Sequence, residues 1–271
     1  MLSATLTGLV AVGAGLVYWN KKNSTYRLNG QERHRNLVLG FSENALKLTK
    51  PMALDALAHH SQLLWVVDTL SFGAGYVDIG KSVNREQRRS IRQVELSEDS
   101  DSGFEVLLSH VKRPELFAKS LAIDLDLTSP VQCAMLESLL LEIGNNIMTG
   151  KLKQMPNYVL FLNHYHLYRT PALDTMLMEL ATGAHHYRIG ITLATEAIGG
   201  LCAYVNLCEH IHILDDSWNG TLTETDHLRN PAILASHINA EIKKGQLRYL
   251  DNTTAESDTF FDLPKSSFWE T

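Results

Sequence analysis

The 271-residue sequence contains few cysteines and no excess of positive charge. Its three cysteines, Cys133, Cys202 and Cys208, have no CxxC spacing and lie in apolar stretches, so they predict buried thiols in a reducing compartment rather than a disulfide framework. A formal net charge of −6 gives the chain no overall attraction to nucleic acid, and such contact would need a local basic patch. With 45% hydrophobic residues, the composition predicts one large globular domain.

Long uncharged runs are also scarce, and the clearest one is at the N-terminus. Residues 2–19 carry no charge, end in Tyr18-Trp19 and are followed by Lys21-Lys22. This length is close to the roughly 20 residues that cross a bilayer. Aromatic residues are typical of the membrane interface and lysines of the cytoplasmic flank. We therefore expect a single transmembrane helix in the inner membrane, N-terminus outside and soluble domain in the cytoplasm. A cleaved signal peptide is the alternative, but its positive charge would precede the run.

The rest of the chain divides into a polar tether at 20–35, a folded domain at 36–264 and a short tail at 265–271. Short apolar runs predict strands at 36–41, 62–69, 157–163, 189–195, 209–214, 246–251 and 259–263. Helical spacing predicts helices at 50–60, 103–110, 114–121, 130–148, 170–187 and 231–244. Buried strands that alternate with helices indicate an α/β fold, with a mainly parallel sheet covered on both faces.

Two of these strand ends carry a family resemblance. One predicted strand is followed by Asn163-His164, and the next ends in Ala194-Thr195-Glu196. The segment 158–197 resembles the core of the FtsK/HerA superfamily of DNA-pumping ATPases, which includes the type IV secretion coupling proteins. In that family the first strand ends in Asp-Glu and the second in Ala-Thr-Gln. The stretches 245–252 and 260–264 are similar to the family's closing hairpin. The resemblance implies a RecA-like P-loop fold, and a transmembrane segment ahead of the motor domain is also typical of coupling proteins.

The resemblance also implies where a degenerate nucleotide site would lie. Its positions are Gly40, Lys47, Thr49, Asn163 and Glu196. A phosphate-binding loop has the form GxxxxGK[ST], in which glycines admit the phosphates, lysine neutralises them and Ser/Thr holds Mg²⁺. At the turn after the first strand, Leu46 replaces the second glycine, Glu43 adds a negative charge and Leu48 separates the lysine from the threonine. We therefore expect the Walker A function to be lost there.

The other two parts of that site are altered as well. Asn163-His164 replaces the acidic pair that would hold Mg²⁺ and orient water, and Glu196 replaces the glutamine that would sense the γ-phosphate. We therefore expect a pseudo-ATPase without catalytic residues, bound ATP or Mg²⁺. Its expected role is that of a structural or interaction subunit, in a ring or hetero-oligomer, of a secretion, conjugation or DNA-transfer machine. The alternative is an active membrane-tethered translocation ATPase with a non-standard site.

A basic stretch offers a separate contact surface. Arg85, Arg88, Arg89 and Arg92 have helical spacing and precede an acidic segment at 97–102. Such a stripe contacts nucleic-acid phosphate or anionic lipid in some proteins, and in others it is a solvated face paired with acids.

Histidines raise the question of a metal site. His164 and His166 follow one strand, and His185 and His186 precede the next, so the four imidazoles would bind Zn²⁺ or Ni²⁺ if they converged. Chance neighbours on solvated loops are the simpler interpretation, and we expect no metal.

Overall fold

The computed structural model describes residues 34–40, 42–58, 61–68, 91–96, 101–113, 120–151, 158–196, 201–214, 246–251 and 258–262. The predicted membrane helix, almost all of the tether, the predicted helix at 231–244 and the tail lie outside these ranges. Within them, no helix combines the length and apolarity that crossing a membrane requires.

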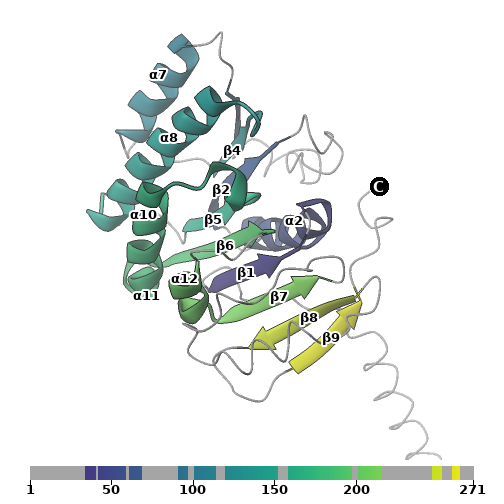
Figure 1. The fold of residues 1–271 in the computed structure, drawn as a ribbon. Coiled ribbons are helices and arrows are strands. Elements are labelled where there is room, and N and C mark those ends of the chain that lie inside the picture. The colour runs from purple at the N-terminus through teal and green to yellow at the C-terminus, as the bar shows by residue number, and fades with distance from the viewer. Residues whose placement is uncertain are drawn as a thin grey trace, which may run out of the picture.

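The described strands form one nine-stranded sheet in the order β3-β4-β2-β5-β6-β1-β7-β8-β9 (Figure 1). The strands from β3 to β7 in this order are parallel to one another, whereas β8 and β9 are antiparallel to their neighbours. The bounds are β1 (Arg35–Leu39), β2 (Gln62–Val67), β3 (Ile91–Glu95), β4 (Ser120–Asp124), β5 (Tyr158–Leu162), β6 (Ile189–Thr195), β7 (His210–Leu214), β8 (Gln246–Asp251) and β9 (Asp258–Asp262). The predicted α/β fold with a mainly parallel sheet is thereby confirmed.

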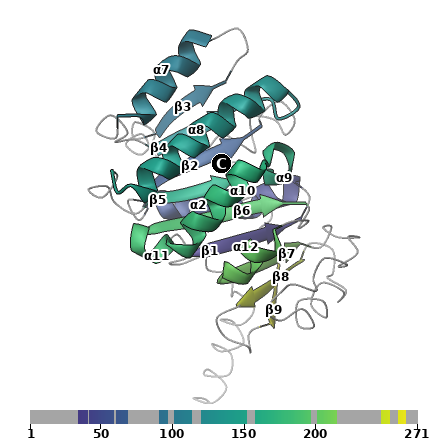
Figure 2. The same cartoon turned by 60° about the vertical axis from the view of Figure 1, so that its left-hand side comes forward.

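Helices cover both faces of this sheet (Figures 1 and 2). The described helices are α2 (Ser42–Ala58), α7 (Asp101–Val111), α8 (Pro130–Met148), α9 (Tyr165–Tyr168), α10 (Pro171–Thr182), α11 (Ala184–Tyr187) and α12 (Cys202–Leu207). One hydrophobic cluster joins the sheet to α7, α8, α10 and α12, and a second joins the opposite face to α2. The sheet is therefore the middle layer of three.

The starts of α8 and α10 follow directly from local sequence. Ser129 and Thr170 are the N-caps, and each accepts a backbone N–H three residues later through its hydroxyl. A proline follows each cap, at a position where a helix needs no N–H donor. These are the signals that make the two helices predictable.

Several predicted elements were wrong in kind or extent. Arg92 lies in β3, an edge strand, so the helical spacing of the arginine stripe does not continue to its last member; the other three arginines are outside the described residues. Arg92 is exposed, and its guanidinium lies 2.7 Å from Nδ1 of His110.

The end of the helix predicted at 114–121 is instead the start of the buried strand β4, because a short apolar run fits a buried strand or a buried helix equally well. Helix α2 starts at Ser42, ahead of the predicted residue 50.

Two of the cysteines belong to described side chains, and both are free thiols. Cys133 is half-buried and Cys208 is buried. Burial raises the pKa of the Cys208 thiol well above its usual value, so this residue behaves as a small apolar side chain.

Candidate functional site

The carboxyl ends of β1, β5 and β6 meet at one edge of the sheet. Leu39 pairs with Thr195, and Leu162 pairs with Leu193, so Gly40, Asn163 and Glu196 all follow strand ends at this edge. The chain leaves β1 toward β2 on one side and later returns to β7 on the other, which makes β1 a topological switch point. Open α/β sheets bind their ligands at such a point.

The turn between β1 and α2 is very short at this edge. Only residues 40 and 41 separate the strand from the helix. The backbone N–H of Gly40 donates to the carbonyl of Thr195 over 3.2 Å. A Cβ atom at position 40 would lie 2.5 Å from Cδ1 of Leu214 on β7. Close packing against β7 therefore accounts for the glycine, and two residues are too few for the GxxxxGK[ST] loop.

Two predicted site residues are brought together as a buried pair. Thr49 on α2 donates through its hydroxyl to Oδ1 of Asn163 over 2.9 Å, and the amide of Asn163 donates to the carbonyl of Val66 over 2.9 Å. Thr49 is 0% exposed and Asn163 is 1% exposed. This chain of hydrogen bonds joins α2, β5 and β2, and it occupies the groups that would otherwise approach Mg²⁺.

The side chain of Lys47 makes a different kind of contact from that of Thr49. Its ammonium group donates over 2.7 Å to Oδ1 of Asn44, one turn earlier on α2. The side chain is half-buried. This contact is a local pair along the helix surface, worth a few tenths of a kcal/mol, about 0.3, in an isolated helix.

Histidines and Glu196 complete the carboxyl edge. His164 adopts a left-handed conformation, φ 56° and ψ 32°, and is 2% exposed. Burial, and then the neighbouring His166, lower the pKa of His164 to about 4. Nδ1 of His166 accepts the backbone N–H of Glu196 over 3.3 Å, and its Nε2 lies 3.9 Å from the Glu196 carboxylate. Burial also lowers the pKa of His166, against the pull of Glu196. Both rings are therefore neutral near pH 7.

These groups leave little space between them. The hollow at this edge is lined by Gly40, Ala45, Leu46, Asn163, His164, His166, Ala194 and Thr195, and it has no room for a water molecule. The four histidines considered for a metal site do not converge, because His185 and His186 on α11 precede β6 and so lie at the opposite edge. Among the described side chains, no group of three or more metal-binding residues occurs.

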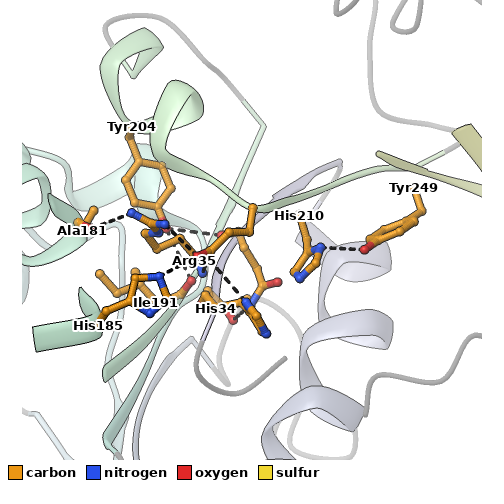
Figure 3. A network of polar contacts seen from close by, with 11 residues as sticks. His34, Arg35, Ala181, His185, Ile191, Tyr204, His210 and Tyr249 are labelled. Carbon is orange, nitrogen blue, oxygen red and sulfur yellow. Dashed lines mark hydrogen bonds and ion pairs between the residues drawn. The ribbon is translucent and has the colours of Figure 1, made fainter. Parts of the chain in front are cut away.

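A second polar cluster lies at the amino end of β1, and sequence reasoning missed it (Figure 3). The Arg35 guanidinium contacts Oε1 of Glu209 at 2.6 Å and donates to the carbonyl of Ala181 over 3.0 Å. The backbone N–H of Arg35 donates to Oε2 of Glu209 over 2.6 Å, and the N–H of Glu209 donates back to the carbonyl of Arg35 over 2.9 Å. This reciprocal arrangement fixes the start of β1 to β7.

Histidines surround the same carboxylate. His185 Nε2 lies 3.2 Å from Oε1 of Glu209, and His34 Nδ1 lies 3.6 Å from Oε2. Burial alone would raise the pKa of the Glu209 carboxyl, but the nearby His34 imidazole and the hydrogen bonds from Arg35 outweigh it and hold the pKa well below its usual value. The carboxylate is therefore ionised at every physiological pH. Its contacts with Arg35, His34 and His185 join the start of β1 to α11 and to the start of β7.

Another part of the sequence matches the phosphate-binding spacing. Gly75, Gly80, Lys81 and Ser82 fit GxxxxGK[ST], and they follow the second predicted strand rather than the first. The motif requires a strand directly before it and a helix after it. Residues 68–74 separate the motif from β2, and residues 75–82 lie outside the described ranges.

The sequence has no match among protein-family models and none among curated proteins. Solved structures do share its fold. The genome packaging NTPase B204 from Sulfolobus turreted icosahedral virus 2, in complex with AMP, is 14% identical, covers 86% of this chain and 98% of its own, and has a TM-score of 0.53. The bacterial conjugative coupling protein TrwBdeltaN70 is 9% identical over 87% of this chain and 86% of its own, with a TM-score of 0.54.

A secretion ATPase completes the comparison. The cytoplasmic domain of the type VII secretion ATPase EccC from Thermomonospora curvata is 12% identical, with a TM-score of 0.50. The match covers 88% of this chain and only 26% of EccC. At these identities the likeness is one of fold. It confirms the resemblance to FtsK/HerA-like ATPases at that level: this chain has the RecA-like fold of packaging, conjugation and secretion NTPases.

Proposed function

We propose that this chain is a non-hydrolysing RecA-like subunit that serves as an interaction module in a DNA-transfer or secretion machine. The observation that carries the proposal is the two-residue turn between β1 and α2. A phosphate loop surrounds anions with several backbone N–H groups, and a direct passage from strand to helix provides no such loop.

The buried pair at the same edge supports the proposal. Magnesium prefers carboxylate ligands and retains several water molecules, so its site needs charge and space. Here Asn163 is neutral and bonded to Thr49 and to the backbone of Val66. The neighbouring His164 is held neutral by burial. The polar contacts at this edge therefore hold α2 against the sheet.

ATP turnover by the full chain, purified in mild detergent, tests this proposal. We expect no phosphate release above that of a blank preparation with ATP and Mg²⁺. Turnover that disappears in Asn163→Ala and persists in the matched control Asn145→Ala would contradict it. Asn145 is suitable because its side chain is exposed on α8.

The GxxxxGK[ST] match at 75–82 favours a second candidate function, an active nucleotide-dependent translocation ATPase. In that case Lys81 would neutralise the phosphates and Ser82 would hold Mg²⁺. Turnover lost in Lys81→Ala but kept in Lys47→Ala would establish this candidate. Equal ATP turnover by wild type and Lys81→Ala would exclude this candidate function.

The proposed setting is a membrane-associated assembly of several proteins. Two of the matched structures are a conjugative coupling protein and the cytoplasmic domain of a secretion ATPase, which supports protein partners for this chain. The uncharged run at 2–19 and the lysines after it support an anchor with the folded domain in the cytoplasm. Full-length chain should stay with membranes after carbonate washing, and deletion of residues 2–19 should release it. Release of the full-length chain by the wash would contradict the anchor.

A further inference from the structure

The β8–β9 hairpin is an extension at one side of the parallel sheet. Among the described strands, β8 pairs with β7, and β9 pairs only with β8 (Figure 1). An element that attaches along one strand opens at a lower free energy than the central strands of a sheet. The contacts between β7 and β8 therefore decide whether the hairpin stays attached.

Three ring side chains connect these two strands. His210 and His212 are alternate residues of β7 and share one face, and Tyr249 pairs with His212 across the ladder. The ring centroid of Tyr249 lies 5.6 Å from that of His210 and 5.4 Å from that of His212. The Tyr249 hydroxyl lies 2.6 Å from Nδ1 of His210 (Figure 3).

Both imidazoles are buried in their neutral form. Burial, followed by the neighbouring His210, lowers the pKa of His212 to about 3. Burial and then His34, whose ring centroid is 4.8 Å away, lower the pKa of His210, while Asp251 and Glu209 oppose them. No charge of α2, which covers this face, is among the described groups that shift the His210 pKa.

The hydroxyl of Tyr249 keeps its proton over the whole physiological range. Burial, and then Asp251, raise its pKa to about 12. The hydroxyl can therefore donate to Nδ1 of a neutral His210. A protonated imidazole carries hydrogen on both nitrogens and accepts no such bond. Protonation thus removes the acceptor and places a cation in a buried layer.

We propose that His210, His212 and Tyr249 form an acid-released latch that holds the β8–β9 hairpin on β7. The attached hairpin binds fewer protons than the released one, so its attachment is fully present above about pH 6.5 and weakens as the pH falls below this value. Release leaves the N–H and C=O groups of β7 without their strand partner. Such an edge pairs with a strand of another chain.

Hydrogen exchange of the full chain in detergent, at pH 7.5 and pH 5.0 and corrected for intrinsic rates, tests the latch. Residues 246–251 should exchange on the order of 30-fold faster at pH 5.0, the factor for a group with a pKa of about 3 when attached and about 6.5 when released. In the His164→Asn background, which removes the other strongly acid-sensitive histidine, residues 158–162 and 189–195 in the central strands should change little while 246–251 still respond. Unchanged protection of 246–251, or an equal loss in all three segments, would overturn the proposal.

Matched variants separate the latch from general acid sensitivity. The double variant His210→Gln/His212→Gln should lose most of the pH effect on 246–251, whereas the control His186→Gln, on the exposed surface of α11, should keep it. Retention of the full effect in the double variant would overturn the assignment. Tyr249→Phe keeps the ring and removes the hydroxyl, so it should speed exchange of 246–251 about fivefold at pH 7.5. Unchanged exchange in that variant would exclude the hydroxyl as part of the latch.

Discussion

The two ends of strand β1 use polar side chains in opposite ways. At the carboxyl end, where a nucleotide would bind, Thr49 and Asn163 form a neutral buried pair and His164 is held uncharged. At the amino end, Arg35 and Glu209 form an ion pair that His34 and His185 surround. In this fold, charge at the carboxyl end would serve a ligand. Here the strong charges join β1 to β7 and α11 instead.

Under the proposed function, this difference would let the fold persist without nucleotide chemistry. A buried neutral pair needs no ligand to offset its charge, whereas a carboxylate at Asn163 would need Mg²⁺ or a proton. The fold then depends on packing and on the amino-end ion pair. Variants at the two ends can therefore test the comparison separately.

The largest expected effect is at the amino end. Glu209→Gln should lower the free energy of unfolding by about 3 kcal/mol, because it leaves the Arg35 guanidinium without its buried counter-charge. Urea unfolding of the full chain measures the change. The control Glu179→Gln, exposed on α10, should stay within about 0.5 kcal/mol of wild type. Equal changes in the free energy of unfolding for the two variants would show that the Arg35–Glu209 pair has no special weight in stability.

A smaller loss is expected at the carboxyl end. Asn163→Ala should cost about 2 kcal/mol, because the Thr49 hydroxyl and the Val66 carbonyl both lose a buried partner. The same urea experiment compares it with Asn145→Ala, which should be near neutral. A stability equal to wild type, together with a new loss of nucleotide binding, would show that Asn163 serves a ligand.

Acid should also lower the free energy of unfolding through His164, at the carboxyl edge of the sheet. The pKa of His164 is about 4 in the folded chain, below its ordinary value, so its contribution is fully present above about pH 6.5 and is lost as the pH falls toward 4. This loss should amount to about 1.4 kcal/mol at pH 5.5. His164→Asn, which tolerates the left-handed backbone, should flatten the dependence of stability on pH between 6.5 and 4. A profile as steep as that of wild type would show that other groups titrate.

The smallest effect is expected at Lys47. Lys47→Met removes a local pair with Asn44 and should change stability by less than about 0.5 kcal/mol. It should leave nucleotide binding, measured by equilibrium titration, as it is in wild type. A large loss of binding in Lys47→Met would revive a phosphate-binding role for α2.

Local signals explain which parts of the fold were predictable. Helix α8 follows from the Ser129 cap, Pro130 and the apolar spacing after them, and β5 and β6 follow from short buried runs. Strand β4 was missed because its five residues lack the length and alternation that separate strands from helices. Edge strand β3 was missed because its exposed polar residues suggested a solvated helix.

The site was less predictable than the fold. The positions of Asn163 and Glu196 at strand ends follow from the sequence, but the bond between Thr49 and Asn163 joins residues 114 positions apart, and the Arg35–Glu209 pair spans 174 positions. No local pattern marks such partners. The short turn after β1 was also hidden, because Pro51, a residue typical of the first turn of a helix, lies inside α2 and suggests a later start.

Equilibrium binding of fluorescent ATP and ADP to the full chain, with Mg²⁺, tests the central claim most directly. If the carboxyl edge is a structural junction, no saturable binding will appear up to millimolar nucleotide. Micromolar binding that is lost in Asn163→Ala and kept in Asn145→Ala would contradict the claim and make this edge a working nucleotide site.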